Sequence, residues 1–277
     1  LVAPGAIYQG TPLTTVTVQE LRAYRIVSTD DPAYAQPMQP AAVHVKSKPT
    51  GQANGQMSIR YHVYLTLPSR LKKGAEYTIQ LIGVNTRQPE VTYRHDPRRV
   101  RSEAIHVTQI GYRPNDPFKR AYLSLWAGTG GAVEYETDTF EILDAHSGKS
   151  AYTGKVSGEF AADRVESLRG NKNHTQTNVY YLDFHDFKQP GEYVVFVPGI
   201  GVSYPFRIAE NVWQDAFRTS MHGFLFHRSG IELGAPFTNY VRPRPMHPAD
   251  GFKIFQLDVT YWNGEADSVH RSLRRLL

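Results

Sequence analysis

Carboxylates near the end of the chain are the first side chains that could do chemistry. Two of Asp250, Asp258, Glu265 and Asp267 could form a general acid and general base pair. Such a pair needs one carboxylic acid that keeps its proton, and burial in a closed cavity is what raises its pKa. No closed barrel is recognisable around these residues. We therefore expect surface carboxylates, and no catalytic residue in this chain.

Other catalytic and ligand-binding arrangements are disfavoured by spacing. Ser229 lies in HRSGIE at the end of a predicted helix, not in a Gly-x-Ser-x-Gly turn after a strand. His222 and His227 are five residues apart, whereas metal-binding pairs on one helical face are usually four apart. The absence of cysteine excludes disulfides and thiolate ligands. The loops GTGGAV and GKVSG lack the Lys-Ser/Thr ending of a phosphate-binding loop. We expect no cofactor and no metal.

Charge and hydropathy exclude two classes of partner. The formal charge is +5, and the arginines cluster in residues 94–101 and 271–275. No nucleic-acid-binding motif accompanies either cluster, so we interpret both as solvated surface and expect no nucleic-acid partner. No apolar run reaches 18 residues, so we expect no membrane span. The opening LVAPGAIYQG lacks the basic start and leucine-rich run of a signal peptide.

The first hundred residues are predicted to be all-β. QELRA, at residues 19–23, fits either a strand continuation or a short helical turn. KPTGQANGQ and the proline-rich residues 31–40 are predicted loops. The run MSIRYHVYLTL alternates, which places its apolar side chains on one face. The predicted strands are Thr14–Val18, Tyr24–Val27, Ala42–Lys46, Met57–Leu67 and Tyr77–Ile82, and the apolar face comprises Ile59, Tyr61, Val63 and Leu65.

A second all-β segment follows the polar, proline-containing junction RHDPRRVR at residues 94–101. Short strands again alternate with turn signals such as RPNDP, DAHSGK and KQPG, as in an immunoglobulin-like sandwich. The predicted strands are Ile105–Ile110, Ala121–Trp126, Thr139–Leu143, Val179–Phe184, the run after Pro-Gly in KQPGEYVVFVPG, and Ser203–Ile208.

The sequence period changes at Asn211, a predicted N-cap, and indicates a helix that stops near Gly230. The apolar residues of this helix form a wide, aromatic stripe on one face, which should pack on other helices or on the preceding sandwich. The alternative is a lone helix that caps the sandwich. A proline-rich loop, a strand at Phe252–Val259 and the start of a further helix in VHRSLRRLL follow. The stripe comprises Val212, Trp213, Ala216, Phe217, Ser220, Met221, Phe224 and Leu225.

An ordered set of motifs then carries a family resemblance. IHVTQIGYRPNDPFKRAYLS, FEILDAHSGKSAYTG, YYLDFHDFKQPGEYVVFVPGIGVSYPFRIAENVW, FLFHRSGIEL and RPRPMHPADG cover Ala104 to Gly251. Together they resemble the N-terminal immunoglobulin-like domain of glycoside hydrolase family 9 and its joint to the catalytic (α/α)6 barrel. The implied fold is mainly β: two immunoglobulin-like β-sandwiches followed by the first helix of a truncated barrel. The implied domains are an accessory sandwich (1–102), the family's immunoglobulin-like domain (103–209) and the incomplete catalytic domain (210–277).

The resemblance also carries expectations about activity. Family members hydrolyse β-linked glucans, usually β-1,4, with inversion, which needs a base and an acid on opposite sides of the sugar. The family's base lies in an early His-Asp-Ala-Gly-Asp motif and its acid near the end of the barrel. Neither is present, and HPADG (His247–Gly251) does not match, so no catalytic residue carries over. Substrate-binding residues stay unknown, and the resemblance implies an extracellular or periplasmic enzyme.

Two positions depart from the family pattern. Many members carry cysteine in an Arg-Cys-Gly turn and in a Cys-His pair, and some use these to hold zinc. Here the positions read Arg228–Ser229–Gly230 and Met246–His247. A structural zinc site needs four Cys, His or carboxylate ligands. His247 is a single ligand, so we expect no metal there.

Two hypotheses from different classes remain. In the first, the chain is the non-catalytic N-terminal portion of a β-glucan hydrolase, and the rest of the catalytic domain packs on Trp213, Phe217 and Phe224. In the second, it is a free-standing carbohydrate-binding or structural module. The second should show a planar row of exposed aromatic rings on one sandwich face. It should also have to cover the aromatic stripe by itself, since an exposed apolar patch is a liability in a finished module.

Overall fold

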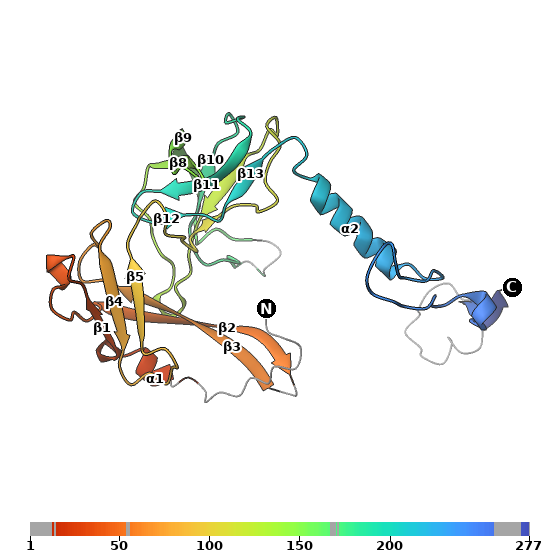
Figure 1. Ribbon diagram of the computed structural model, residues 1–277, viewed down its shortest axis with the longest axis horizontal. Coiled ribbons are helices and arrows are strands. Elements are labelled where there is room, and N and C mark those ends of the chain that lie inside the picture. Colours follow the sequence, from red (N-terminus) through yellow and green to blue (C-terminus); the bar gives the residue numbers. More distant parts are fainter. Residues whose placement is uncertain are drawn as a thin grey trace. The chain divides into compact units, whose positions relative to one another are not determined.

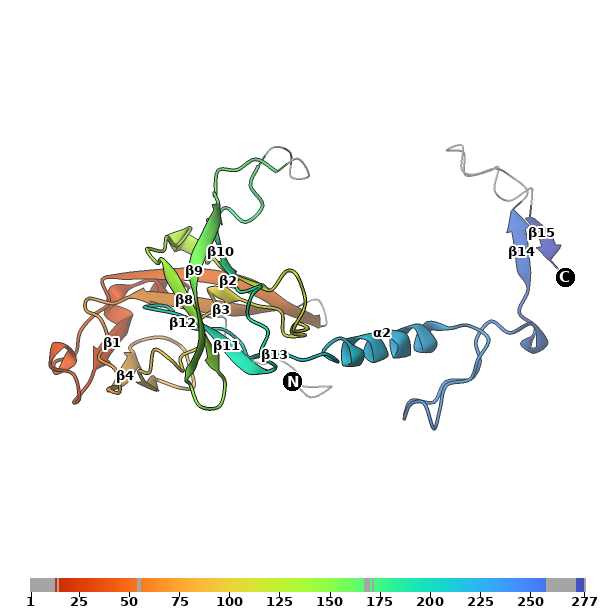
Figure 2. The same ribbon diagram turned by 90° about the horizontal axis from the view of Figure 1, so that it is seen from above.

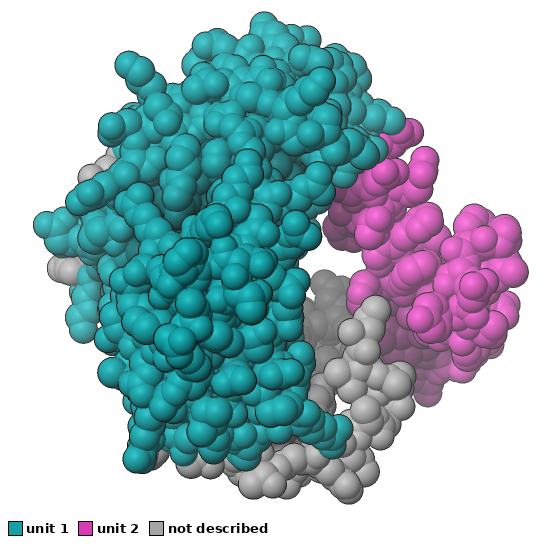
Figure 3. All heavy atoms as spheres, turned by 60° about the vertical axis from the view of Figure 1, so that its left-hand side comes forward, with its two compact units in different colours: residues 1–212 teal, residues 213–277 magenta. Residues whose placement is uncertain are grey.

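The chain divides into two compact units, residues 1–212 and 213–277 (Figure 3). A computed structural model describes residue 13, residues 15–53, 56–166, 170, 172–257 and 273–276. The described part is mainly β, as predicted, with one long helix, α2, in the second unit (Figure 1).

The first hundred residues build a three-stranded antiparallel sheet and a separate ribbon. The sheet has the order β1-β4-β5, with β1 at Tyr24–Val27, β4 at Glu76–Leu81 and β5 at Glu90–Arg94. Its small core packs Tyr34 edge-on against Tyr77, with ring centroids 5.3 Å apart. The strands predicted for β1 and β4 are confirmed to within one residue, while β5 was not predicted.

The ribbon is a long hairpin of β2 (Ala42–Ala53) and β3 (Gln56–Thr66) (Figure 1). Its length corrects the prediction that KPTGQANGQ is a loop, because Lys48–Ala53 continues β2 and pairs with the start of β3. The alternation predicted in β3 is real, yet Ile59 and Val63 are exposed. The apolar face of the ribbon is therefore uncovered over part of its length within the described residues.

The start of the described chain contradicts the strand predicted at Thr14–Val18. Thr15–Val18 is a single helical turn, α1, and Leu21–Ala23 is a 3₁₀ turn, which was one of the two alternatives for QELRA. Val18 is buried, and its carbonyl accepts a hydrogen bond from the Tyr24 hydroxyl at 2.7 Å. This tertiary contact outweighs the β propensity of the Thr-Val run.

Residues 100–209 form the second β-region, with its strands in the path β12-β11-β8-β9-β10-β7-β6 and β13 beside β11. The long strand β9 belongs to both halves of this path: residues 150–155 pair with β8, and residues 156–160 pair with β10 (Figure 2). The bounds are β6 Ile105–His106, β7 Arg120–Leu123, β8 Thr139–Asp144, β9 Ser150–Phe160, β10 Val179–Asp183, β11 Gly191–Val197, β12 Gly201–Val202 and β13 Phe206–Ile208.

The core of this β-region is aromatic and aliphatic, with Phe140, Phe184 and Phe206 among its buried side chains. Gly154 in β9 makes room for one of them, since a Cβ there would lie 2.4 Å from Phe140 Cζ. β9 was not predicted, because its glycines and polar residues are typical of a loop. The predicted strands at residues 105–110 and 121–126 are shorter than expected, and the one at 203–208 is interrupted by Pro205.

The predicted junction at residues 94–101 is built into the second β-region. Val100 and Ser102 exchange backbone hydrogen bonds with Val202. The Arg98 guanidinium pairs with Glu141 at 2.9 Å and lies over the Phe196 ring at 4.9 Å. The interpretation of this arginine cluster as solvated surface is therefore wrong for Arg98: its contacts tie the junction to β8 and β11.

The second unit contains α2 (Gln214–His227), the 3₁₀ turn Pro248–Asp250, and the antiparallel pair β14 (Ile254–Leu257) and β15 (Leu273–Leu276). The N-cap of α2 is Trp213 rather than the predicted Asn211. The helix predicted in VHRSLRRLL is wrong for Leu273–Leu276, which is a strand. Leu-Arg-Arg-Leu fits either period, and pairing with β14 decides between them. Residues 258–272 lie outside the described part.

Candidate functional site

Only one of the four carboxylates considered from the sequence lies within the described residues. Asp250 accepts two hydrogen bonds from the Arg244 guanidinium, at 2.8 and 2.9 Å. These hydrogen bonds lower the pKa of the Asp250 carboxyl, and both side chains are exposed. An exposed, paired carboxylate cannot serve as the protonated acid of an inverting hydrolase. Asp258, Glu265 and Asp267 lie outside the described residues.

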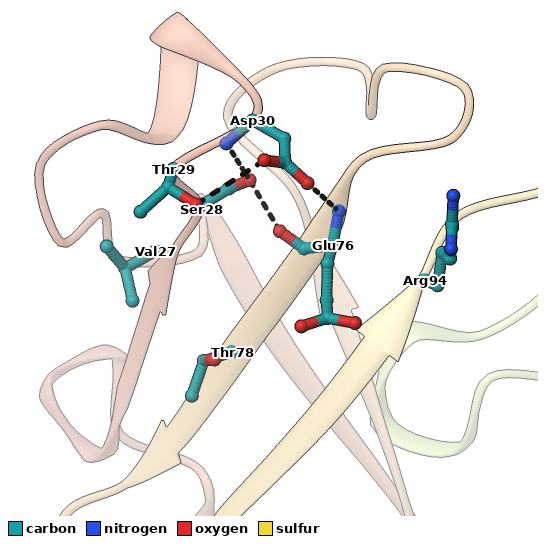
Figure 4. Close-up of a pocket in the computed structure, with 7 residues that line it drawn as sticks. All are labelled: Val27, Ser28, Thr29, Asp30, Glu76, Thr78 and Arg94. Carbon is teal, nitrogen blue, oxygen red and sulfur yellow. Dashed lines mark hydrogen bonds between the residues drawn. The ribbon is translucent and has the colours of Figure 1, made fainter.

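A polar hollow of about 330 Å³ lies where β1 ends and β4 begins (Figure 4). The Asp30 carboxylate accepts the Glu76 backbone N–H at 3.1 Å, and the Ser28 hydroxyl accepts the Asp30 N–H at 3.1 Å. Ser28 in turn donates to the Glu76 carbonyl. Asp30, Glu76 and Arg94 are all exposed. The hydrogen bonds close a turn between two strands, and nothing in this hollow desolvates a carboxyl group as an acid catalyst requires.

A second hollow, the β6–β7 hollow, has a volume of about 440 Å³ and a mixed apolar and polar lining. The Arg120 guanidinium donates from Nε and Nη2 to Asp183 Oδ2, at 3.1 and 2.7 Å. The other carboxylate oxygen accepts the His185 backbone N–H and contacts His185 Nδ1. The lining residues are His106, Val107, Thr108, Tyr112, Phe118, Arg120 and Tyr122.

The Asp183 carboxyl is strongly acidic in this arrangement. Partial burial opposes its ionisation, but the hydrogen bonds from Arg120 and His185 outweigh that effect and lower its pKa from 3.8 to about 2. Because the pKa is depressed in the folded state, its contribution to stability is fully present above the unfolded value. That contribution is lost as the pH falls from about 4 towards 2.

We expect Asp183→Asn to flatten the acid limb of the stability curve. The parent chain should lose about 1 kcal/mol of unfolding free energy between pH 4 and pH 2 that the variant does not lose, after discounting for solvent screening. Urea unfolding across this range measures the difference. Asp186→Asn is the matched control, since Asp186 also contacts His185 but is 75% exposed. Equal acid sensitivity in parent and Asp183→Asn would contradict the assignment.

Lys119 is a buried lysine in the segment RPNDPFKR, residues 113–120. Its ammonium donates to the Pro114 carbonyl at 2.8 Å and to the Asp116 carbonyl at 3.0 Å. Burial lowers the pKa of this ammonium, and the side chain has no exposed surface. Lys119 therefore holds the loop between residues 113 and 119 closed from inside.

The two turns that depart from the family pattern lie against each other. The Ser229 hydroxyl donates to Met246 Sδ at 3.7 Å, and the Gly230 N–H donates to the Pro245 carbonyl at 2.7 Å. His247 Nδ1 accepts the Ala249 N–H at 3.2 Å. A hydroxyl and a thioether are poor zinc ligands, so these residues do not fit the metal that some family members hold here. Within the described ranges, no group of three His, Asp or Glu side chains could hold a metal.

This proximity leads to a gain-of-binding prediction. The double variant Ser229→Cys with Met246→Cys places two thiolates and the His247 imidazole together, so it should bind Zn²⁺ about 100-fold more tightly than the parent chain. Competition with a chromogenic chelator under reducing conditions measures the affinity. Adding His247→Ala should remove most of the gain. Identical affinities for the parent and the double variant would show that the two turns do not approach as described.

The aromatic stripe on α2 is exposed. Trp213, Phe217 and Phe224 keep 47%, 65% and 73% of their surface, and Met221 lies between them in the same row. Val212, predicted to begin the stripe, is instead buried beside Gly111. None of the described helices has the length and hydropathy of a membrane-crossing segment.

Sequence patterns missed the two ion pairs that organise the β-region, Arg98–Glu141 and Arg120–Asp183. Each joins residues more than forty positions apart. The sequence carries only a weak sign of the second pair, because Arg120 begins one strand and Asp183 ends another. The two become neighbours only when β7 and β10 pair.

Comparison with known proteins finds a family profile that is similar to part of this chain. Residues 100–202 match the sequence profile of the cellulase N-terminal ig-like domain. Endoglucanase D of Acetivibrio thermocellus is 28% identical over 162 residues, covering 58% of this chain and 21% of the relative. The chain thus spans about a fifth of the length of the curated relatives that it matches.

Solved structures of similar proteins include two family 9 enzymes. A metagenome-derived glycoside hydrolase family 9 endoglucanase is 30% identical, over 50% of this chain and 24% of that one, with a TM-score of 0.40. A family 9 protein of Bacteroides ovatus is 23% identical, over 52% and 23%, with a TM-score of 0.38. By sequence, residues 100–202 are thus similar to the cellulase N-terminal ig-like domain.

Proposed function

We propose that this chain is the non-catalytic N-terminal portion of a family 9 glycoside hydrolase that acts on β-linked glucan with inversion. The match of residues 100–202 to the cellulase domain carries the proposal. We further propose that the domains divide at 102/103 and 209/210, and that this chain contributes no catalytic carboxylate and no metal site to the enzyme.

The exposed row on α2 is proposed to be the contact for the rest of the catalytic domain. Trp213, Phe217 and Phe224 follow one another at four- and seven-residue intervals, which places them on one helical face. Exposing this apolar row to water costs about 25 cal/mol of free energy for each Å² of apolar surface. We propose that neighbouring helices of the barrel cover this face, as in any helix bundle.

The free-standing module is the less favoured reading for a geometric reason. A flat crystalline glucan is best met by coplanar aromatic rings. Tyr122 and Tyr181 instead meet edge to face at 82°, and Tyr135 and Tyr180 at 81°. These tyrosines pack against each other rather than form a flat platform.

A β-glucan hydrolase meets its polymeric substrate outside the cytoplasm, which supports an extracellular or periplasmic location.

The test combines sequence and activity. The reading frame past Leu277 should encode a helical domain with an Asp-Ala-Gly-Asp-like motif. This chain alone should release no reducing sugar from carboxymethyl-cellulose, and mixing it with the separately produced downstream domain should restore hydrolysis. The triple variant Trp213→Ser, Phe217→Ser and Phe224→Ser should abolish that complementation. The control Tyr240→Ser, which also alters an exposed aromatic of the second unit, should leave it intact. Hydrolysis by this chain alone, or an immediate stop codon in the native gene, would overturn the proposal.

A further inference from the structure

We propose that the β6–β7 hollow of the immunoglobulin-like domain binds a β-linked gluco-oligosaccharide. Its volume of about 440 Å³ is in the range of small-ligand sites. The hollow lies on the non-catalytic domain and has no part in the hydrolysis proposed above. The choice of glucose as the sugar rests on that proposed function, whereas the presence of a site rests on the side chains of the hollow.

Two aromatic rings give the hollow its apolar surface. Phe118 keeps 76% of its surface exposed and Tyr122 keeps 40%, although both belong to the folded β-region. The face of an aromatic ring is electron-rich, and the axial C–H bonds of a β-linked glucose present a weakly positive face. Exposed rings beside hydrogen-bonding groups are therefore suited to a pyranose, which has both an apolar face and a rim of hydroxyls.

The polar lining includes a donor on Arg120 and an acceptor on His106. His106 Nε2 lies 3.0 Å from the Ser124 carbonyl, which can only accept, so Nε2 carries the proton and Nδ1 of the neutral ring is an acceptor. Arg120 donates from Nε and Nη2 to Asp183, and within the described residues its Nη1 has no hydrogen-bond acceptor. A sugar hydroxyl both donates and accepts, so vicinal hydroxyls can satisfy the two groups together.

Charge balance favours an uncharged ligand over a phosphate or sulfate. The positive charge of Arg120 is already matched by Asp183, at 2.7 Å. An anion would compete with Asp183 for the same guanidinium nitrogens, while a hydroxyl needs only the remaining one.

Two of the lining side chains, Arg120 and Tyr122, are also held in place before any ligand binds. The Arg120 guanidinium lies over the Tyr181 ring at 5.0 Å, and the Tyr122 ring meets Tyr181 edge-on with centroids 5.7 Å apart. The pairing of β7 with β10 puts Tyr122 directly opposite Tyr181. Side chains that are fixed in advance lose little conformational entropy on binding.

Titration calorimetry and NMR of the full 277-residue chain with cellohexaose test the site. Tyr122→Ala and Phe118→Ala should each weaken binding at least tenfold. Tyr240→Ala is the matched control, because Tyr240 is an aromatic of the second unit that is 80% exposed, and it should leave affinity unchanged. Maltohexaose, with α-linkages, should bind more weakly. Phe118 is the safer variant for folding, since its ring is the more exposed of the two.

The proposal is overturned if cellohexaose fails to bind at millimolar concentration, or if both hollow variants bind as well as the parent chain. Either result leaves the complementation of hydrolysis untouched, so failure of this site is distinguishable from failure of the proposed function. A chain that binds cellohexaose through the hollow but does not complement hydrolysis would support the site and reject the enzyme assignment.

Discussion

Gly128→Ala should separate the β2–β3 ribbon from the immunoglobulin-like domain, with a loss of about 3 kcal/mol in unfolding free energy. Gly128 begins the 3₁₀ turn Gly128–Gly130, and a Cβ there would lie 2.2 Å from the Val45 carbonyl oxygen. The clash would push apart two hydrogen bonds that join the ribbon to this turn: Val45 N–H to Thr129 Oγ1 at 3.0 Å and Lys46 Nζ to the Trp126 carbonyl at 3.2 Å. Hydrogen exchange of residues 42–66 measures the separation.

Gly131→Ala is the matched control for this prediction. Gly131 has φ of 72°, close to the 65° of Gly128, but an added Cβ there meets no atom within 4 Å. With ψ of −153°, Gly131 lies in a region that glycine almost alone adopts, so the control should lose about 1–3 kcal/mol from backbone strain but leave exchange in the ribbon unchanged. Equal exchange of residues 42–66 in the two variants would mean that the Gly128 contact does not hold the ribbon.

Lys119→Ala should destabilise the immunoglobulin-like domain by about 3 kcal/mol, which corresponds to a fall in melting temperature of about 15 °C. The substitution leaves the Pro114 and Asp116 carbonyls without their buried donor and opens a cavity where the side chain was. Because burial lowers the pKa of Lys119, the parent chain should also gain stability as the pH rises through that lowered pKa towards 10.5.

Calorimetry of the parent chain, Lys119→Ala and Lys149→Ala measures this effect. Lys149 is an exposed lysine of the same domain, in the turn before β9, and its replacement should change the melting temperature by a degree or two at most. A Lys119→Ala protein that melts with the parent would show that the loop at residues 113–119 does not need its buried ammonium.

Strands bounded by strong turn signals were predictable from sequence. β8, β10 and β11 each combine β-branched or aromatic residues with a nearby Gly, Pro or Asp turn, and all three lie where expected. β9 was not predictable, because the glycine that suggests a loop is needed there for the Phe140 ring. The strand predicted at Thr14–Val18 and the helix predicted in VHRSLRRLL were wrong for a related reason: a contact outside the local run decides the conformation. That contact is the Tyr24 hydroxyl for Val18 and the pairing with β14 for Leu273–Leu276.

Sequence reasoning was better at identifying the family than at finding surfaces. The motifs that begin at residue 104 led to the cellulase N-terminal ig-like domain, whose profile matches residues 100–202, because their order and spacing are specific. The β6–β7 hollow could not be predicted, since it exists only when His106, Phe118 and Tyr122 are brought together by the pairing of β6 with β7. The aromatic stripe of α2 was predicted except for its first member, Val212, which the preceding β-region buries.

The way the chain enters and leaves the immunoglobulin-like domain has a mechanical consequence. Near the entry, Arg101 and Val202 form a parallel bridge, in which the Ser102 N–H donates to the Val202 carbonyl. Near the exit, Tyr112 and Ile208 form another, in which the Tyr112 N–H donates to the Arg207 carbonyl and the Tyr112 carbonyl accepts the Ala209 N–H. Tension between the two ends would load these hydrogen bonds in shear, several at once, instead of unzipping them one by one. A pulling experiment should therefore find this domain resistant to force.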